Sequence, residues 1–544
     1  MNALDRRTLL KLAGAGAILS AGSSALIGCS SSGSGTGSVG NTGTDLVPWP
    51  TYLRASGPTP DLVADGEGAQ DAYFAYPGEL TPSVSETPGN GEVITAMIPT
   101  YSPPPKSVED NRLWQAINEA LGVDLRLNLV PIAEYQSKLA TLMASNELPD
   151  IVLINGTVPR IREFISAKCA DLSDFIGGDN VEEYPNLANI PTYSWQAVGR
   201  IGGRLYGIPI TRGRMPVVLH VNRTLMDQAG APEEWSQDQF FAAMQALTGS
   251  GTYGYGAVSS DLGFNYFSGS LGAPNNWKVE DGAFVSAYET DEYRAALEFA
   301  REVYAAGCYH PSSLTSELAD IMNVYYSGDV ASVLGSYYNY ANGTYLDRVG
   351  DRFATDIALP FGDQRTSWLG GGLFGYTVFK NADADRIRLL LRVCNYLAAP
   401  YGTVEHELVN YGVEGEHFTR TADGLAMTEL AGLENNNSVP ISKYVCDSPD
   451  VIQVPGNEQA TRRAFEYQSE VLPAGLTDPS VGLSSPTSDR ELATLQGSML
   501  DAVKAIVLGR ADISTWDDAL KKWRDGGGAA IADELSTEYE ASVE

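Results

Sequence analysis

Strand-like and helix-like segments alternate through the first part of the globular region, and this alternation limits the possible folds more than any other feature of the chain. Residues 92–99, 123–129 and 150–154 are typical of strands, and residues 107–121 and 134–146 are typical of helices. Strands that alternate with helices predict a parallel sheet with right-handed crossovers. Ligands of such sheets bind beyond the carboxyl ends of the strands, so the loops at residues 99–105 and 155–158 are positioned for function.

The rest of the chain is long enough to form a second lobe. Of 544 residues, roughly 450 remain after the first 91, which is more than one hydrophobic core usually holds. The further predicted segments are a hairpin-like run at 203–210, strands at 216–221 and 330–334, helices at 224–229, 236–247, 288–306, 382–398, 492–508 and 515–524, and a glycine stop at 526–528. Ser236 is the expected N-cap of its helix. These segments predict an α/β protein with two lobes.

The N-terminal residues are typical of an export signal. Arg6 and Arg7 precede an apolar, Ala- and Gly-rich run at residues 12–26, which is short for a membrane span. The paired arginines resemble the twin-arginine signal, which directs export of folded proteins. The alternative, an N-terminal membrane anchor, is disfavoured because no flanking cluster of stop-transfer charges follows the run. We therefore predict a twin-arginine signal peptide at residues 1–28.

Residues 26–29, Leu-Ile-Gly-Cys, resemble the lipobox of bacterial lipoproteins. In that motif the cysteine takes a diacylglycerol and becomes the new N-terminus, so the resemblance implies lipidation of Cys29, with fatty acids such as palmitate as its acyl chains. Each acyl methylene buried in a membrane contributes about 0.8 kcal/mol, so two or three chains hold a protein firmly. Residues 29–44 are predicted to form a flexible Ser-, Gly- and Thr-rich tether. The expected location is the extracytoplasmic face of the cell membrane, with the protein held there by its lipid anchor.

The segment at residues 45–91 is rich in Pro, Gly and Ser, and we predict an extended segment that packs on the globular body. The whole chain has a formal net charge of −32, which argues against nucleic acid or anionic lipid as a partner.

Four cysteines remain after Cys29, and both free buried thiols and disulfides are open alternatives. They are Cys169, Cys308, Cys394 and Cys446.

Three stretches resemble the family of extracellular solute-binding proteins (family 1 type) of sugar ABC importers. They are residues 143–151, residues 203–210 followed by 217–222, and residues 272–277 together with 411–417. The resemblance covers essentially the whole mature chain. It implies a type II periplasmic-binding-protein-like fold, in which crossing strands join two α/β lobes around a ligand cleft that closes by hinge motion. The crossings are expected near residues 212–217 and 359–361. Lobe 1 is expected at 92–214 and about 360–405, and lobe 2 at 215–359 and about 406–544.

The family resemblance also implies a function. A monomeric lipoprotein is expected to capture an oligosaccharide or sugar derivative and deliver it to the permease subunits of an ABC importer, without being an enzyme. Some relatives carry an acidic calcium loop after the helix that corresponds to 236–247. Here residues 248–254 have no carboxylate, so no metal is expected. The glycine pattern of this loop follows a helix, which is the wrong context for a dinucleotide, and no cofactor is expected.

The candidate ligand-binding residues combine aromatic rings, which stack on sugar faces, with polar groups that fix hydroxyls. The aromatic candidates are Trp277, Tyr337, Tyr338 and Trp368, and the polar candidates are Tyr101, Asn155, Arg212, Arg214 and Asn276. The resemblance places a stacking aromatic after the strand at 330–334, where Tyr337 and Tyr338 stand. For each aromatic the alternative is core packing, and for each arginine it is a surface or hinge salt bridge.

Two other function classes fit the sequence. One is a secreted carbohydrate-active enzyme, because carboxylates are too abundant for composition to decide whether a glycosidase pair is present. The other is a structural cell-surface lipoprotein. Turnover of glycans would favour the enzyme, and the absence of any glycan-induced stabilisation would favour the structural protein.

Overall fold

The computed structural model of this protein describes most of the chain after the export signal. The described residues are 39–101, 103–145, 147–156, 158–249, 251–421, 424–435 and 442–543. The predicted signal peptide, Cys29 and residues 30–38 of the predicted tether lie outside this set. Within these ranges, none of the helices combines the length and the apolar character that crossing a membrane requires.

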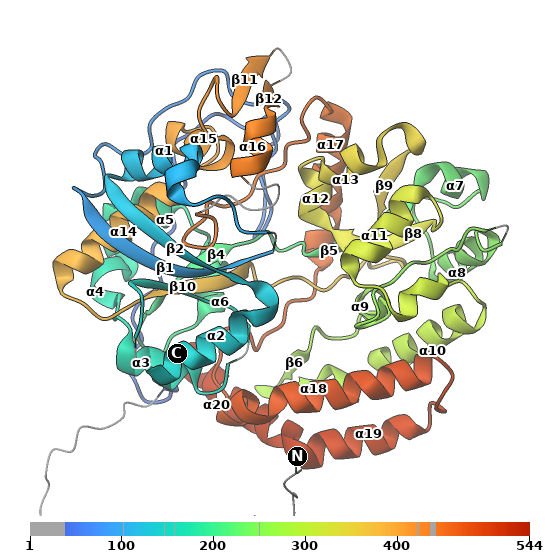
Figure 1. Cartoon of the computed structure of the whole chain (residues 1–544). Helices are drawn as coiled ribbons and strands as arrows, with labels where there is room; N and C mark the ends of the chain where they lie inside the picture. Colours follow the sequence, from blue (N-terminus) through green and yellow to red (C-terminus); the bar gives the residue numbers. More distant parts are fainter. Residues whose placement is uncertain are drawn as a thin grey trace, which may run out of the picture. The chain divides into compact units, whose positions relative to one another are not determined.

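A five-stranded sheet organises the first lobe, with the strand order β2-β1-β3-β10-β4 (Figure 1). Its strands are β1 (Glu92–Thr100), β2 (Val123–Pro131), β3 (Ile151–Ile154), β4 (Gly207–Thr211) and β10 (Leu373–Phe379). β1 pairs in parallel with β2 and β3, as the alternation of elements predicts. β10 is antiparallel to both β3 and β4, so the complete sheet is mixed rather than parallel. The sequence analysis did not identify β10 as a strand.

The first hydrophobic core surrounds this sheet. Its helices are α1 (Arg112–Leu121), α2 (Ile132–Ser145), α3 (Ile161–Lys168), α4 (Ser173–Ile176), α5 (Pro185–Ala188), α6 (Thr192–Val198), α14 (Ala384–Leu397) and α15 (Val404–Tyr411). All four residues of β3 are buried, as expected for a central strand with both faces covered. α16 (Glu429–Glu434) packs against α1, where the buried Glu434 accepts a hydrogen bond from the Leu113 N–H at 3.0 Å.

A three-stranded antiparallel sheet organises the second lobe, with β5 (Val217–Asn222) between β8 (Ser332–Ser336) and β9 (Thr355–Ala358). A hairpin of β6 (Trp277–Glu280) and β7 (Ala283–Ser286) lies apart from it. β11 (Phe418–Thr421) with β12 (Gly424–Met427) forms another hairpin, which lies beside α15 and α16 of the first lobe (Figure 1). The second lobe also contains the helices α7 (Arg223–Gln228), α8 (Gln237–Ala246), α9 (Phe264–Ser270), α10 (Asp291–Ala305), α11 (Leu318–Ser327), α12 (Tyr337–Ala341), α13 (Thr344–Val349) and α17 (Glu458–Val471).

Local sequence signals explain several of these elements. Ser236 caps α8 and forms a capping box with Gln239, which confirms the predicted N-cap. The interior of this lobe contains a group of packed phenylalanines, in which the ring centroids of Phe240 and Phe361 are 5.2 Å apart. Such rings bury large apolar areas, and they fix how α8, α9 and α10 pack together.

The C-terminal helices complete the second core. They are α18 (Pro486–Val507), α19 (Thr515–Trp523) and α20 (Ala529–Val543), and α18 and α19 lie side by side (Figure 1). The predicted glycine stop at 526–528 is a kink rather than an end, because Gly527 adopts a φ of 137° and the chain then resumes as α20. This last helix was not predicted.

Two crossing segments, residues 212–216 and 359–372, join the sheets of the two lobes. They are hydrogen-bonded to one another, with the Arg212 N–H to the Gly372 carbonyl at 3.0 Å and the Gly370 N–H to the Arg214 carbonyl at 2.9 Å. The predicted two-lobed α/β fold with crossing strands is therefore confirmed. The precise lobe boundaries remain a prediction.

The four described cysteines, Cys169, Cys308, Cys394 and Cys446, are free and buried. The structure thus favours the free-thiol alternative. Burial raises the pKa of the Cys169 thiol to about 12, so this side chain is held as an unreactive thiol at neutral pH.

Candidate functional site

The sheet topology brings two predicted site residues to one edge of the first sheet. Tyr101 follows β1 and Asn155 follows β3, and these parallel strands end at the same edge. β10 begins at this edge and runs back between β3 and β4, which places Phe374 there as well. Gly375 is required beside Asn155, since a Cβ at residue 375 would come within 2.5 Å of the Ile154 carbonyl oxygen.

Three aromatic rings meet at this edge. The ring centroids of Tyr101 and Phe374 are 6.1 Å apart, those of Tyr101 and Tyr444 are 5.9 Å apart, and those of Phe374 and Tyr444 are 4.7 Å apart. Tyr444 is buried, whereas Tyr101 is 48% exposed. Partial burial raises the pKa of the Tyr101 phenol to about 12, so it remains a neutral hydrogen-bonding group.

Two cations and a carboxylate extend this aromatic group. The Arg212 guanidinium lies over the Phe374 ring at 5.2 Å, and its Nη1 is 3.3 Å from Oδ2 of Asp447. The Nζ of Lys443 is 2.8 Å from the same oxygen. Burial by itself lowers the pKa of Lys443, but the surrounding acidic groups, chiefly the Asp447 carboxylate, together outweigh burial and the pKa lies above its ordinary value. Asp447 and the nearby Asp450 thus hold both cations in their charged forms.

The Lys443 ammonium also connects the first lobe to the second. Its Nζ lies 5.5 Å from the ring centroid of Tyr338, at the start of α12, and Tyr338 is 39% exposed. We call this set of contacting residues the strand-end cluster. Its members are Tyr101, Arg212, Tyr338, Phe374, Lys443, Tyr444 and Asp447.

Tyr337, the neighbour of Tyr338, is placed differently. It is only 1% exposed, and its hydroxyl donates to the Ala464 carbonyl of α17 at 2.8 Å. Its ring stacks on Tyr467 with centroids 6.1 Å apart. Of the two adjacent tyrosines, one therefore packs in the core and one faces the space between the lobes.

A groove of about 730 Å³ adjoins the strand-end cluster, within the size range of small-molecule sites. Its walls are rich in amide side chains. They include Asn339, Asn342, Asn410, Asn435 and Gln453, together with Tyr338, Lys443 and Asp447 of the cluster. Tyr401 and His406 are among the lining residues, and the Tyr401 hydroxyl and the His406 Nδ1 are buried and have no hydrogen-bond partner within the described ranges. Buried polar atoms without a protein partner are suited to a ligand or an ordered water.

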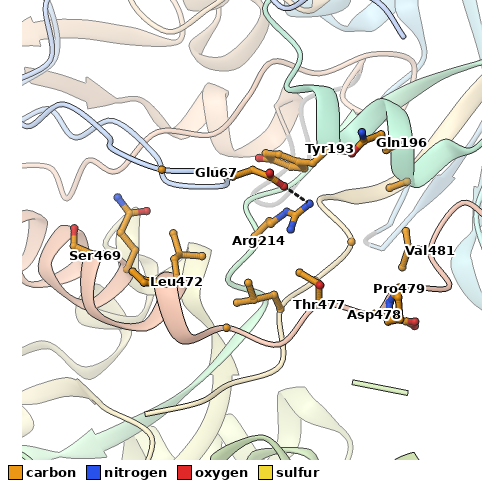
Figure 2. Close-up of a pocket in the computed structure, with 18 of the residues that line it drawn as sticks. Glu67, Tyr193, Gln196, Arg214, Ser469, Leu472, Thr477, Asp478, Pro479 and Val481 are labelled. Carbon is orange, nitrogen blue, oxygen red and sulfur yellow. Dashed lines mark ion pairs between the residues drawn. The ribbon is translucent and has the colours of Figure 1, made fainter. Parts of the chain in front are cut away.

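Arg214 lies in a different cavity, the junction pocket, which has a volume of about 660 Å³ (Figure 2). α6 contributes Tyr193, and the Arg214 guanidinium lies over its ring at 4.6 Å. The Nη2 of Arg214 is 2.6 Å from Oε1 of Glu67, which comes from the Pro- and Gly-rich extension. A salt bridge, which is the alternative to ligand contact named for each arginine, is thus present at Arg214.

Asn276, Trp277 and Trp368 line a third cavity, of about 230 Å³, in the second lobe. Trp277 is 6% exposed and packs against Trp523, with ring centroids 6.2 Å apart. The Trp368 Nε1 donates to the Ala273 carbonyl at 2.7 Å. Asn276 is exposed and donates to Asp478 at 2.9 Å. None of the three is in the strand-end cluster.

The structure thus unites Tyr101, Arg212 and Tyr338 in one cluster, with Asn155 at the same sheet edge, and separates the remaining candidates. Sequence reasoning missed Phe374, Lys443, Tyr444 and Asp447. The four-residue spacing of Lys443 and Asp447 is a recognisable charge pair, but it gives no indication that the pair lies between two lobes.

The loop predicted to lack calcium is held by local hydrogen bonds instead. The Thr248 hydroxyl donates to the Met244 carbonyl at 2.8 Å and accepts from the Gly254 N–H at 3.0 Å. In the part of the chain that the structure describes, there is no group of three or more His, Cys, Asp or Glu residues arranged to hold a metal ion.

Two α/β lobes, which the chain joins at several crossings and which line a groove together, define a two-lobed binding protein. The family model described as a bacterial extracellular solute-binding protein matches residues 113–393, which is more than half of the chain. The chain therefore belongs to the family of bacterial extracellular solute-binding proteins.

Two curated relatives come from Bacillus subtilis (strain 168). Lipoprotein LipO is 22% identical over 84% of this chain and 93% of its own length. The polygalacturonan/rhamnogalacturonan-binding protein YtcQ is 22% identical over 81% of this chain and 89% of its own length.

Solved structures share the fold. The solute-binding protein associated with an HMO-binding ABC transporter of Bifidobacterium longum infantis has a TM-score of 0.63 at 12% identity, covering 84% of this chain and all of that chain. The substrate-binding protein FusA of S. pneumoniae, solved with kestose, has a TM-score of 0.62 at 15% identity, covering 83% of this chain and 99% of that chain.

Proposed function

We propose that this protein captures an oligosaccharide in the groove beside the strand-end cluster and delivers it to the permease subunits of an ABC importer. The observation that carries the proposal is the composition of the groove, where amide side chains and the half-exposed Tyr338 ring line one cavity. Amides hydrogen-bond sugar hydroxyls, and a ring face stacks on the C–H face of a sugar. Relatives named for binding polygalacturonan, HMO and kestose support the same class of ligand.

The charges of the site favour a neutral oligosaccharide over a polyuronate. Arg212 and Lys443 share Asp447, and Arg214 is paired with Glu67, so each of these cations already has a carboxylate partner. The formal net charge of −32 adds a repulsive field for polyanions. We therefore expect this protein to differ in specificity from YtcQ, whose name records acidic polysaccharides.

Substitution of Tyr101 or Tyr338 by alanine is expected to weaken oligosaccharide binding about tenfold each, because each removes a stacking face. Both side chains are substantially exposed, so the free energy of unfolding should change by less than about 1 kcal/mol. Isothermal titration calorimetry with a panel of neutral and uronate-containing oligosaccharides measures the affinities.

The matched control is Tyr304→Ala, on α10 and outside the groove, which should leave the affinity unchanged. Unaltered affinity in both Tyr101→Ala and Tyr338→Ala would place the ligand elsewhere. Hydrolysis of the glycans during the titration would instead favour a carbohydrate-active enzyme.

The proposed membrane attachment through Cys29 is tested separately. Cys29→Ala should move the protein from the membrane fraction to the soluble fraction, since no acyl chain is then added. Sugar binding should be retained, because the site lies in the described globular part. A Cys29→Ala variant that still sediments with membranes would contradict the lipid anchor.

A further inference from the structure

We propose that residues 62–74 of the Pro- and Gly-rich extension form a brace between the two lobes, which restricts their hinge motion. The extension runs along the first lobe before and after this stretch, and in its middle it contacts the crossing segments and α17 of the second lobe. The proposal of a brace depends only on the two-lobed fold, whereas its expected effect on ligand affinity also depends on the proposed function.

The extension is fixed to the first lobe on both sides of the brace. Before it, the Leu53 N–H donates to the Ala188 carbonyl at 2.9 Å, and the Thr51 hydroxyl donates to Asp179 at 2.7 Å. After it, the Ser83 N–H donates to the carboxylate of Glu405 at 2.8 Å. The parts of the extension that precede and follow the brace are therefore both anchored to the first lobe.

The middle of the brace is bound to the second lobe. The Gln70 N–H donates to Oε1 of Gln468 at 2.9 Å, and Nε2 of Gln468 donates back to the Gln70 carbonyl at 2.7 Å. Gln468 lies on α17 and is 1% exposed, so its side-chain amide is shielded from water. The guanidinium of Arg462, also on α17, lies over the Phe74 ring at 4.2 Å.

The brace also enters the core beneath the crossing segments. Ala72 is fully buried in a cluster that contains Met215 and Leu359 of the two crossings. The Tyr73 N–H donates to the Ile452 carbonyl at 2.9 Å, and the Ile452 N–H donates to the Asp71 carbonyl at 2.9 Å. These backbone bonds hold the brace in register with the chain that leads into α17.

The junction pocket shows where the brace would oppose rotation of the lobes. α6 of the first lobe and α17 of the second line its opposite sides, and Glu67 reaches Arg214 between them (Figure 2). Gly68 passes directly against Arg214, since a Cβ at residue 68 would lie 2.8 Å from its side chain. A hinge rotation changes the separation of α6 and α17, and the brace must then break its contacts with Arg214 or with Gln468.

The brace should therefore narrow the range of lobe arrangements in the ligand-free protein. Dyes on Glu163→Cys of α3 and Asp238→Cys of α8, both exposed, report the interlobe distance by single-molecule energy transfer. The native cysteines Cys169, Cys308, Cys394 and Cys446 are buried and should not react with the dye. The double variant Glu67→Gln/Gln468→Leu removes the ion pair and both glutamine bonds. Glu67→Ala is a milder variant at a side chain that is 65% exposed, so it should fold normally.

Without ligand, the distance distribution should broaden in the double variant, broaden less in Glu67→Ala, and stay unchanged in the control Asp124→Ala. Asp124 forms an ion pair with Arg126 within β2 at 2.6 Å, the same length as the Glu67–Arg214 pair, and so is a matched contact outside the extension. Identical interlobe-distance distributions for the unaltered protein, the double variant, Glu67→Ala and the control would overturn the proposed brace.

Oligosaccharide titrations separate the brace from the proposed function. Because a looser protein loses more conformational freedom on closing, the double variant should bind about threefold more weakly or worse. Equal affinity despite a broadened distribution would overturn the role of the brace in affinity. If no oligosaccharide binds even the unaltered protein, the proposed function fails, while the ligand-free distributions still decide whether the brace exists.

Discussion

Replacement of Asp447 by alanine is expected to lower the free energy of unfolding by about 3 kcal/mol, because it removes the ion-pair partner of the largely buried Lys443 and leaves the nearby Asp450 to offset the charges of both Lys443 and Arg212. The side chains of Asp447 and Lys443 are 9% and 10% exposed, and that of Arg212 is 27% exposed. Urea denaturation at neutral pH, followed by circular dichroism, measures the loss. A change below about 1 kcal/mol would contradict the arrangement described for the strand-end cluster.

The chain contains a matched control for this experiment. Lys521 and Asp525 form an ion pair at 2.5 Å with the same four-residue spacing, but their side chains are 73% and 65% exposed. Asp525→Ala should therefore cost less than about 1 kcal/mol. The double variant Lys443→Met/Asp447→Leu should recover part of the free energy of unfolding that Asp447→Ala loses. Replacing both members of the buried ion pair by apolar groups leaves fewer charges unpaired.

Acidification is expected to destabilise the protein through two buried histidines. Burial lowers the pKa of His220 to about 4 and that of His406 to about 4, against an ordinary value of 6.5. In the unfolded chain these rings take up protons near pH 6.5, whereas in the folded protein they resist protonation until about pH 4. Each histidine should therefore lower the free energy of unfolding by up to about 3 kcal/mol as the pH falls from 6.5 to 4.

His220→Phe isolates this effect, because phenylalanine retains a ring beside Tyr345, whose centroid lies 4.9 Å from that of His220. The urea midpoint of the variant should fall less steeply between pH 7 and about pH 4.5 than that of the unaltered protein. The many carboxylates titrate in both proteins, so the difference between the two slopes reports His220. Parallel slopes would contradict the buried neutral histidine.

The sequence analysis predicted the parts of the fold that depend on local periodicity. The alternation between residues 92 and 154 predicted that β1, β2 and β3 are parallel, and Ser236 predicted the start of α8. It did not predict β10, because that strand pairs with partners about 160 to 230 residues earlier in the chain. The glycines at 526–528 suggested an end, but packing of α20 on α18 carries the helical chain beyond the kink.

Local sequence by itself determined which residue types were available for a sugar site, and the strand ends placed Tyr101 and Asn155 at one edge. Only the tertiary structure decided that Tyr338 faces the groove while Tyr337 packs in the core, since a single helical step separates them. It also decided that Arg212 and Arg214, two residues apart, reach different cavities and different carboxylates. The physical reason is that burial and charge pairing are set by chain segments distant in sequence, such as 67 and 447, which the local pattern around each residue does not encode.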